Sequence, residues 1–163
     1  MMTYTVLLSI VMMAGLFFML WSAVGFIQDK RFFTSAPKAA QEVIQPKEER
    51  FRGQHAVGWL LMILALVLMG GEMIAGAYDG IQKEFGFWQF FLRFAMMLLL
   101  KAFDILFFDW VLLCHSNFFA HYYPEVKDIY GPEIFGYNKK SHLIQTVLIL
   151  LGSLLAAWIC TLM

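Results

Sequence analysis

Three charged side chains that could do chemistry lie inside a long apolar stretch of the sequence. Lys101 and Asp104 are three residues apart, so on a helix they are neighbours on one face and can neutralise each other. An ionisable group at mid-membrane is expensive and often marks a functional site. Lys101 and Asp104 are therefore candidate catalytic residues. On an α-helix Asp109 points away from Asp104, and we expect it to need a separate partner near the end of the stretch.

Histidines in the aromatic-rich segment 114–142 supply a second set of candidates. His115 or His121 could act as an acid or a base near neutral pH beside the Lys101–Asp104 pair, because imidazole titrates close to pH 7. An α-helical projection places His115 on the same polar stripe as Arg93, Lys101 and Asp104. The alternative is that these aromatics form an interfacial belt and the histidines only hydrogen-bond the loop.

The same segment could hold a transition metal. Two or three imidazoles and a carboxylate form a plausible open site. The candidate ligands are His115, His121, Glu125 and His142, and Asn117 is a further polar residue at this end. Their spacing does not demand a metal, because His115 and His121 are six residues apart and Pro124 interrupts the chain before Glu125. Any cofactor stays unknown at this point.

Glu72 and Arg93 lie on successive apolar segments. Counting ~1.5 Å of rise per residue places both at a similar depth on antiparallel helices. We expect a contact between them, direct or through water. Such a pair could fix helix register or form part of an ion pathway.

Apolar helices must position all of these groups. The chain has 163 residues, of which 61% are hydrophobic and 17% aromatic, a composition too apolar for a soluble domain. A membrane-spanning helix needs ~20 mostly apolar residues. The sequence predicts an all-α protein, a single domain over residues 1–163. Its four transmembrane helices are expected at about 5–27, 55–78, 87–113 and 143–162. A short helix over about 38–45 and a new helix start at Pro46 precede the second span.

The basic residues predict the orientation. The 28–54 connection carries six Lys and Arg residues and the 114–142 connection three, whereas the 79–86 connection carries one. Because basic residues stay on the cytoplasmic side, both richer connections should be cytoplasmic loops and both termini should lie outside. The Gly and Pro breaks of the second loop predict an ordered, surface-hugging segment.

Three classes of function stay open. The first is binding or modification of a lipidic or other apolar small molecule at a buried Lys/Asp site that opens toward the His-containing aromatic loop. The second is an oligomeric proton- or ion-coupled transporter or channel subunit, with small residues such as Gly71 and Gly152 supplying contacts between copies. The third is a structural or assembly role. Membrane lipids are expected partners, while nucleic-acid binding and nucleotide hydrolysis have no supporting motif.

The string FDILFFDW, followed by a His-containing aromatic loop and YPE, resembles a pattern in uncharacterised bacterial four-helix integral membrane proteins. The resemblance covers residues 101–125. It implies the bacterial cytoplasmic (inner) membrane as the location and implies no particular activity.

Overall fold

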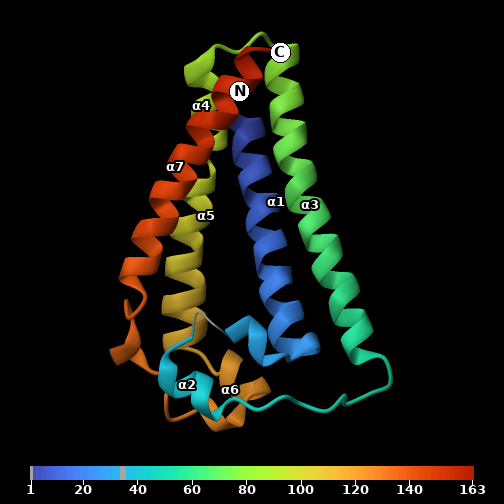
Figure 1. The fold of residues 1–163 in the computed structure, drawn as a ribbon, viewed down its shortest axis with the longest axis vertical. Helices are drawn as coiled ribbons and strands as arrows, with labels where there is room; N and C mark the ends of the chain where they lie inside the picture. Colours follow the sequence, from blue (N-terminus) through green and yellow to red (C-terminus); the bar gives the residue numbers. More distant parts are fainter. Residues whose placement is uncertain (1, 34–35) are drawn as a thin grey trace.

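Long helices dominate the computed structural model, which describes residues 2–33 and 36–163 and is all-α in that part of the chain. Helix α1 (Met2–Trp21) continues into the π-helical segment η1 (Ser22–Ile27), and α3 (Gln54–Gln82) and α7 (Lys139–Thr161) are the other long helices. The segments Thr3–Ile27, Gln54–Gln82 and Lys139–Thr161 are long and apolar enough to cross a membrane. Both termini lie at one end of the bundle, and the short helices α2 (Lys38–Val43) and α6 (Phe118–Tyr122) lie at the other (Figure 1).

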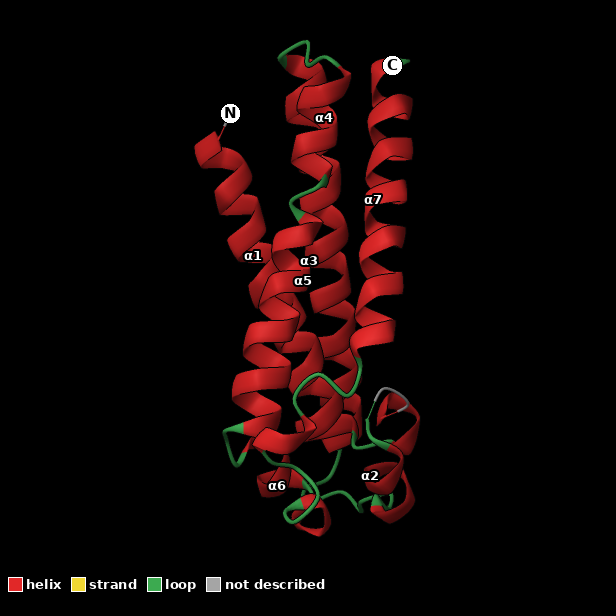
Figure 2. Cartoon of the chain, turned by 90° about the vertical axis from the view of Figure 1, so that its left-hand side faces the viewer, coloured by secondary structure: helices red, strands yellow, loops and turns green. Residues whose placement is uncertain are grey.

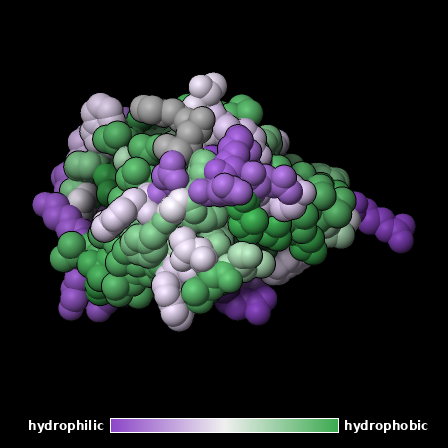
Figure 3. Space-filling model, turned by 90° about the horizontal axis from the view of Figure 1, so that it is seen from above, coloured by the Kyte–Doolittle hydropathy of each residue, from purple (hydrophilic) through white to green (hydrophobic). Residues whose placement is uncertain are grey.

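The long helices expose large apolar side chains. Only 17% of the apolar window of α3 and 11% of that of α7 are buried inside the structure. Val67, Ile74 and Leu148 are among the exposed side chains. Figure 3, which looks along the bundle from the end with the termini, shows hydrophobic residues over large parts of the visible surface, with hydrophilic residues between them. Apolar faces of this extent suit a lipid environment far better than water.

The predicted span 87–113 is not one continuous helix. It consists of α4 (Phe87–Phe94), α5 (Met97–Phe103) and the π-helical segment η3 (Asp104–Cys114). Between α4 and α5 the backbone tightens, because the N–H of Leu98 bonds the carbonyl of Ala95 at 2.8 Å, three residues back. The structure therefore has three long spanning candidates where the sequence predicted four. Hydropathy reports how apolar a segment is and is blind to such breaks.

The broken column α4–α5–η3 stands between α1 and α7 (Figures 1 and 2). One buried cluster joins α1 to the column and contains Leu8, Met12, Met96 and Leu100. A second cluster joins the column to α7 and contains Phe90, Phe94 and Ala157. Helix α3 packs along α1 and also contacts α4 and α7. The column thus has packed helices on two sides.

Small residues of α3 serve packing within the chain. A methyl group on Gly76 would lie 3.4 Å from Cδ of Arg93, and Gly80 lies against the ring of Phe90. By contrast, Gly71 and Gly152 are exposed on the outside of the bundle.

The two long connections pack together at the end opposite the termini, and we call residues 28–33, 36–53 and 115–138 the cap. The cap contains η2 (Lys30–Phe33), α2 (Lys38–Val43), α6 (Phe118–Tyr122), η4 (Pro124–Val126) and η5 (Pro132–Ile134). Its core joins both connections to the end of η1 through Val24, Phe33, Ala40, Ile44, Tyr123 and Val126. The short helix predicted near residue 38 is present as α2. The cap is also tied to α1, because the indole N–H of Trp21 donates to the Tyr122 hydroxyl at 3.0 Å.

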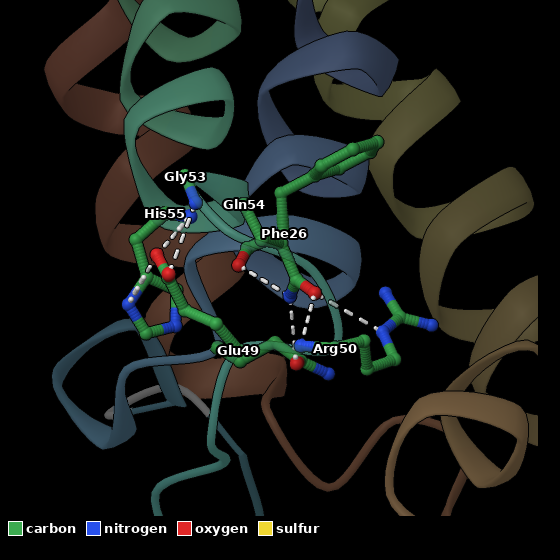
Figure 4. A network of polar contacts seen from close by, with 7 residues as sticks. Phe26, Glu49, Arg50, Gly53, Gln54 and His55 are labelled. Atoms are coloured by element: carbon green, nitrogen blue, oxygen red, sulfur yellow. Dashed lines mark hydrogen bonds and ion pairs between the residues drawn. The ribbon is translucent and has the colours of Figure 1, made fainter.

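Helix α3 begins at Gln54, and the predicted start at Pro46 is wrong. The carboxylate of Glu49 accepts hydrogen bonds from the backbone N–H of His55 at 3.0 Å and of Gly53 at 3.1 Å (Figure 4). The first backbone N–H groups of a helix have no carbonyl partner within the helix, and these bonds supply one. The same bonds lower the pKa of Glu49. Glu49 therefore stabilises the helix from outside it, as a cap rather than as a first-turn residue.

Gln54 locks the first connection onto α1. Its side chain is fully buried, and its amide donates to the Phe26 carbonyl at 2.9 Å and to Gln28 at 3.1 Å. Its side-chain oxygen accepts from the backbone N–H of Arg50 at 3.0 Å (Figure 4). One side chain thus joins the start of α3, the end of η1 and the cap.

We predict that Gln54→Ala lowers the free energy of unfolding by about 2 kcal/mol, because it strands buried donors and acceptors. Thermal unfolding in mild detergent measures the effect. The exposed Gln45→Ala, in the same connection, is the matched control and should stay close to wild type. Equal stability of the two variants would contradict the structural role of Gln54.

Candidate functional site

A group of polar side chains is buried between the column and α7. Lys101, on α5, is 8% exposed and forms an ion pair and hydrogen bond with Asp104, as the three-residue spacing predicted. The Lys101 ammonium also donates to the side-chain oxygen of Gln145, on α7, at 2.6 Å. The lysine therefore has one anionic and one neutral acceptor in a mostly apolar setting.

His142 lies between two carboxylates. Its Nε2 is 2.6 Å from Oδ2 of Asp109, and its Nδ1 is 3.8 Å from Oδ2 of Asp104. The Nδ1 atom is buried and has no hydrogen-bond partner. We refer to Lys101, Asp104, Asp109, His142 and Gln145 as the polar cluster.

Asp109 faces the same side as Asp104, contrary to the prediction from α-helical spacing. The reason is the winding of η3, which is π-helical from Asp104 to Cys114. Residues five apart lie about one turn apart in a π-helix, whereas in an α-helix they point in different directions. The wider turn brings both carboxylates to His142, so His142 is the separate partner that Asp109 required.

Two cavities meet at the polar cluster. The larger, of about 410 Å³, extends from the cluster toward the cap. Its lining residues are Leu16, Met19, Leu20, Ala23, Val24, Phe32, Phe33, Ala36, Met62, Asp104, Phe108, Asp109, Leu113, Phe119, Tyr130 and Tyr137. The smaller, of about 400 Å³, is lined by Leu16, Leu100, Lys101, Asp104, Gln145, Leu148 and Ile149. Asp104 and Leu16 line both, on facing helices.

The larger cavity is apolar along most of its wall and polar at one end. Asp104 and Asp109 bring carboxylates to it, and Tyr130 and Tyr137 bring phenol groups from the cap side. Burial raises the pKa of Tyr130 to about 12, so its hydroxyl is neutral at physiological pH. The arrangement suits a molecule with an apolar body and a polar head.

His115 and His121 do not join the polar cluster. His115 follows η3, is exposed, and its Nδ1 is 2.8 Å from the carbonyl oxygen of Trp110. The π-helical winding rotates it off the stripe that an α-helix would have formed. His121 is exposed on α6, with its ring 4.9 Å from that of Tyr122. The histidine that contacts Asp104 and Asp109 is instead His142.

The predicted metal ligands are separated. Glu125 pairs with Lys47 at 2.8 Å, His142 pairs with Asp109, and His115 and His121 are exposed. In the described residues no group of three or more His, Cys, Asp or Glu side chains is arranged to hold a metal ion. Asn117 is exposed as well, and its backbone carbonyl accepts the N–H of His121 at 2.8 Å. Asp109, Asn117 and Glu125 therefore form no common polar site.

The predicted Glu72–Arg93 contact is replaced by a different pair. Arg93 is 1% exposed, and its Nη1 donates to Asp79 at 2.6 Å and to the Gly76 carbonyl at 2.8 Å. Its guanidinium also lies 4.6 Å from the ring centre of Phe85. One carboxylate oxygen of Glu72 is buried without a hydrogen-bond partner. The predicted span ended at Tyr78, but α3 runs on to Gln82 and so carries Asp79 on the helix surface next to Arg93.

Asp79 and Gln145 are the residues that the sequence prediction missed. Gln145 follows His142 by three residues on an otherwise apolar helix, and this spacing puts both on one face. Asp79 precedes Lys83 by four residues, and the two form an ion pair at 2.7 Å. Polar residues three or four apart were therefore the available signal.

Comparisons of the chain with protein-family models, with curated proteins and with solved structures find no match. The functional argument therefore depends on the geometry of the site.

We predict that Asp79→Asn lowers the free energy of unfolding by about 2 kcal/mol, because it leaves the buried Arg93 charge without its anion. The matched variant Glu72→Gln removes a carboxylate from the same helix but breaks no ion pair. Because one oxygen of Glu72 is buried without a hydrogen-bond partner, this variant should keep or raise the free energy of unfolding. Thermal unfolding in detergent ranks the two variants. If Glu72→Gln were the less stable variant, the result would support a Glu72–Arg93 pair instead of the Asp79–Arg93 pair.

A second prediction concerns the Lys47–Glu125 link between the two halves of the cap. Burial opposes ionisation of Glu125, but the Lys47 hydrogen bond and charge, with backbone hydrogen bonds, outweigh it and lower the pKa below the usual 4.5. The link therefore stabilises the fold fully above pH 4.5, and its contribution is lost as the pH falls through the lowered pKa. At pH 7 we expect Glu125→Gln to lower stability by about 1 kcal/mol.

The measurement is thermal unfolding of wild type and Glu125→Gln between pH 7 and pH 3, with the exposed Glu48→Gln as control. The gap between wild type and Glu125→Gln should close at the acid end. A gap that is independent of pH would show that the variant acts through packing rather than charge.

Proposed function

We propose that the chain is an integral membrane protein in which the column α4–α5–η3 is the fourth membrane-crossing element. The column has 28 residues from Phe87 to Cys114, which at ~1.5 Å per residue is roughly 40 Å of helix, enough for a bilayer. The cap carries most of the basic residues and lies opposite the termini (Figure 1). This supports a cytoplasmic cap and outer termini, and the resemblance over residues 101–125 favours the bacterial cytoplasmic membrane.

We further propose that the protein binds a lipidic or other apolar small molecule, with its polar head at Asp104 and Asp109. The observation that carries this proposal is the meeting of two cavities at the buried polar cluster. Charged groups in a bundle are tolerated when paired, but a pair that only fixes register needs no space beside it. Here, cavities of about 410 and 400 Å³ lie directly against the charges.

The cluster is also equipped for acid–base chemistry on such a molecule. His142 is held by Asp109 at Nε2 while its Nδ1 lies near Asp104. A carboxylate that orients an imidazole is the arrangement by which histidines serve as general acids or bases. His142 lines neither cavity, so modification of the bound molecule would use this imidazole through Asp104 or Asp109, the carboxylates that line the larger cavity. Lys101 would compensate negative charge at Asp104.

Proton-coupled transport is the alternative, and the position of His142 between two carboxylates is what favours it. An imidazole can take a proton at one nitrogen and release one from the other, so His142 could pass a proton between Asp109 and Asp104. A single four-helix bundle is too thin for a wide pore, so this function requires several copies. The exposed Gly71 and Gly152 would allow close approach between them. Proton uptake by protein-containing vesicles that depends on His142 would favour this alternative.

The binding proposal predicts that Leu16→Trp weakens binding of dodecanol by about tenfold or more, because the indole fills the space where both cavities meet. Binding is measured in lipid nanodiscs by native mass spectrometry and by the ligand-induced rise in thermal stability. Phe18→Trp, on the exposed side of the same helix, adds an indole without filling either cavity and should bind like wild type. Absence of saturable dodecanol binding to wild type would contradict the proposal.

A further inference from the structure

We propose that the larger cavity selects apolar molecules with a cationic or strongly hydrogen-bond-donating head, such as a protonated long-chain amine, over those with an anionic head. This inference rests on the binding function proposed above and adds the chemical class of the ligand.

The charged groups on the cavity wall are of one sign. Among the described residues that line the larger cavity, the charged side chains are Asp104 and Asp109. Lys101 lines the smaller cavity, on the other side of Asp104. A head group in the larger cavity therefore meets carboxylates first, with the ammonium behind them.

Both carboxylates keep capacity to accept hydrogen bonds. Asp104 uses Oδ2 for Lys101, and Asp109 uses Oδ2 for His142. An ionised carboxylate has two oxygens and about four acceptor positions, so one bond to a neighbour leaves room for a donor from a ligand. Donors with a positive charge form the stronger bonds to such an acceptor.

The placement of charges in the polar cluster points the same way. Two carboxylates line the larger cavity, whereas the Lys101 ammonium and the His142 imidazole that pair with them lie outside its wall. A cationic head would bring a positive charge beside both carboxylates. An anionic head would place like charges side by side, which is strongly unfavourable where water is scarce.

The rest of the cavity accommodates an apolar tail. Leu16, Leu20 and Val24 line it from the α1 side, and Phe108 and Leu113 line it from η3. At the cap side the neutral Tyr130 hydroxyl can accept or donate, so it does not oppose a cationic head.

The test compares three probes with the same twelve-carbon chain: dodecylammonium, dodecanol and dodecanoate. Each is titrated at pH 7 into the full-length protein in nanodiscs of uncharged lipid, with thermal stability and native mass spectrometry as readouts. Leu16→Trp measures binding outside the cavity, which is subtracted. For wild type we expect dodecylammonium to bind about tenfold more tightly than dodecanol, with dodecanoate weakest.

Asp109→Asn tests the origin of the preference, because the amide retains hydrogen bonding but loses the charge. We expect the ratio between dodecylammonium and dodecanol to fall toward one in this variant. Asp128→Asn removes the same charge from an exposed part of the cap and should keep the wild-type ratio. Correct folding of each variant is checked by its own unfolding transition without probe.

The outcomes separate the two proposals. Cavity-dependent binding of all three probes with equal affinity, or tighter binding of dodecanoate, would overturn the head-group preference and leave apolar binding standing. A preference that survives undiminished in Asp109→Asn, or one that disappears equally in Asp128→Asn, would also overturn it. Absence of cavity-dependent binding for every probe would overturn the binding function, and the inference with it.

Discussion

A lysine ammonium inside an apolar helix bundle needs an anion beside it, and the Lys101–Asp104 pair meets this requirement. The Lys101 ammonium has further N–H donors that Asp104 does not satisfy, and α7 supplies an acceptor for them. The side-chain oxygen of Gln145 accepts from Lys101 at 2.6 Å. His142, one helical turn earlier on α7, then reaches Asp109 at 2.6 Å. Desolvation makes each of these contacts costly to lose, so the polar cluster holds α7 against the column in one register.

The winding of η3 determines what the cluster can do. An α-helix from Asp104 to Cys114 would turn Asp109 away from Asp104 and leave His142 with a single carboxylate. The π-helical turn brings both carboxylates to one imidazole and to one cavity. A π-helix is a less favourable backbone than an α-helix, so its retention over Asp104–Cys114 needs compensation. The bond of Asp109 to His142, which the α-helical winding would not allow, contributes to it. π-Helical segments are also frequent at functional sites.

Features that depend on spacing along one helix could be predicted from the sequence, and features that depend on contacts between helices could not. The three-residue spacing indicated the Lys101–Asp104 pair, and hydropathy indicated the apolar segments 5–27, 55–78 and 143–162. Arg93 was paired with Glu72 because the predicted span ended at Tyr78 and left Asp79 outside the helix, whereas α3 continues to Gln82. The direction of Asp109 was wrong because an α-helical angle per residue was applied to a π-helix. Gln145 and Asp79 required knowledge of which helices are neighbours.

The Arg93–Asp79 pair and the polar cluster differ in whether a cavity lies beside the charges, and this difference indicates different roles. Arg93 is 1% exposed, bonds Asp79 and the Gly76 carbonyl, and has the ring of Phe85 against its guanidinium. It lines neither of the two cavities. A charge enclosed in this way can hold α4 against α3 but has no room to meet a ligand. Asp104 lines both cavities, and its partner Lys101 lines the smaller one. We therefore infer that the Arg93–Asp79 pair fixes the register of α4 against α3. The polar cluster is the group of charges that can contact a ligand.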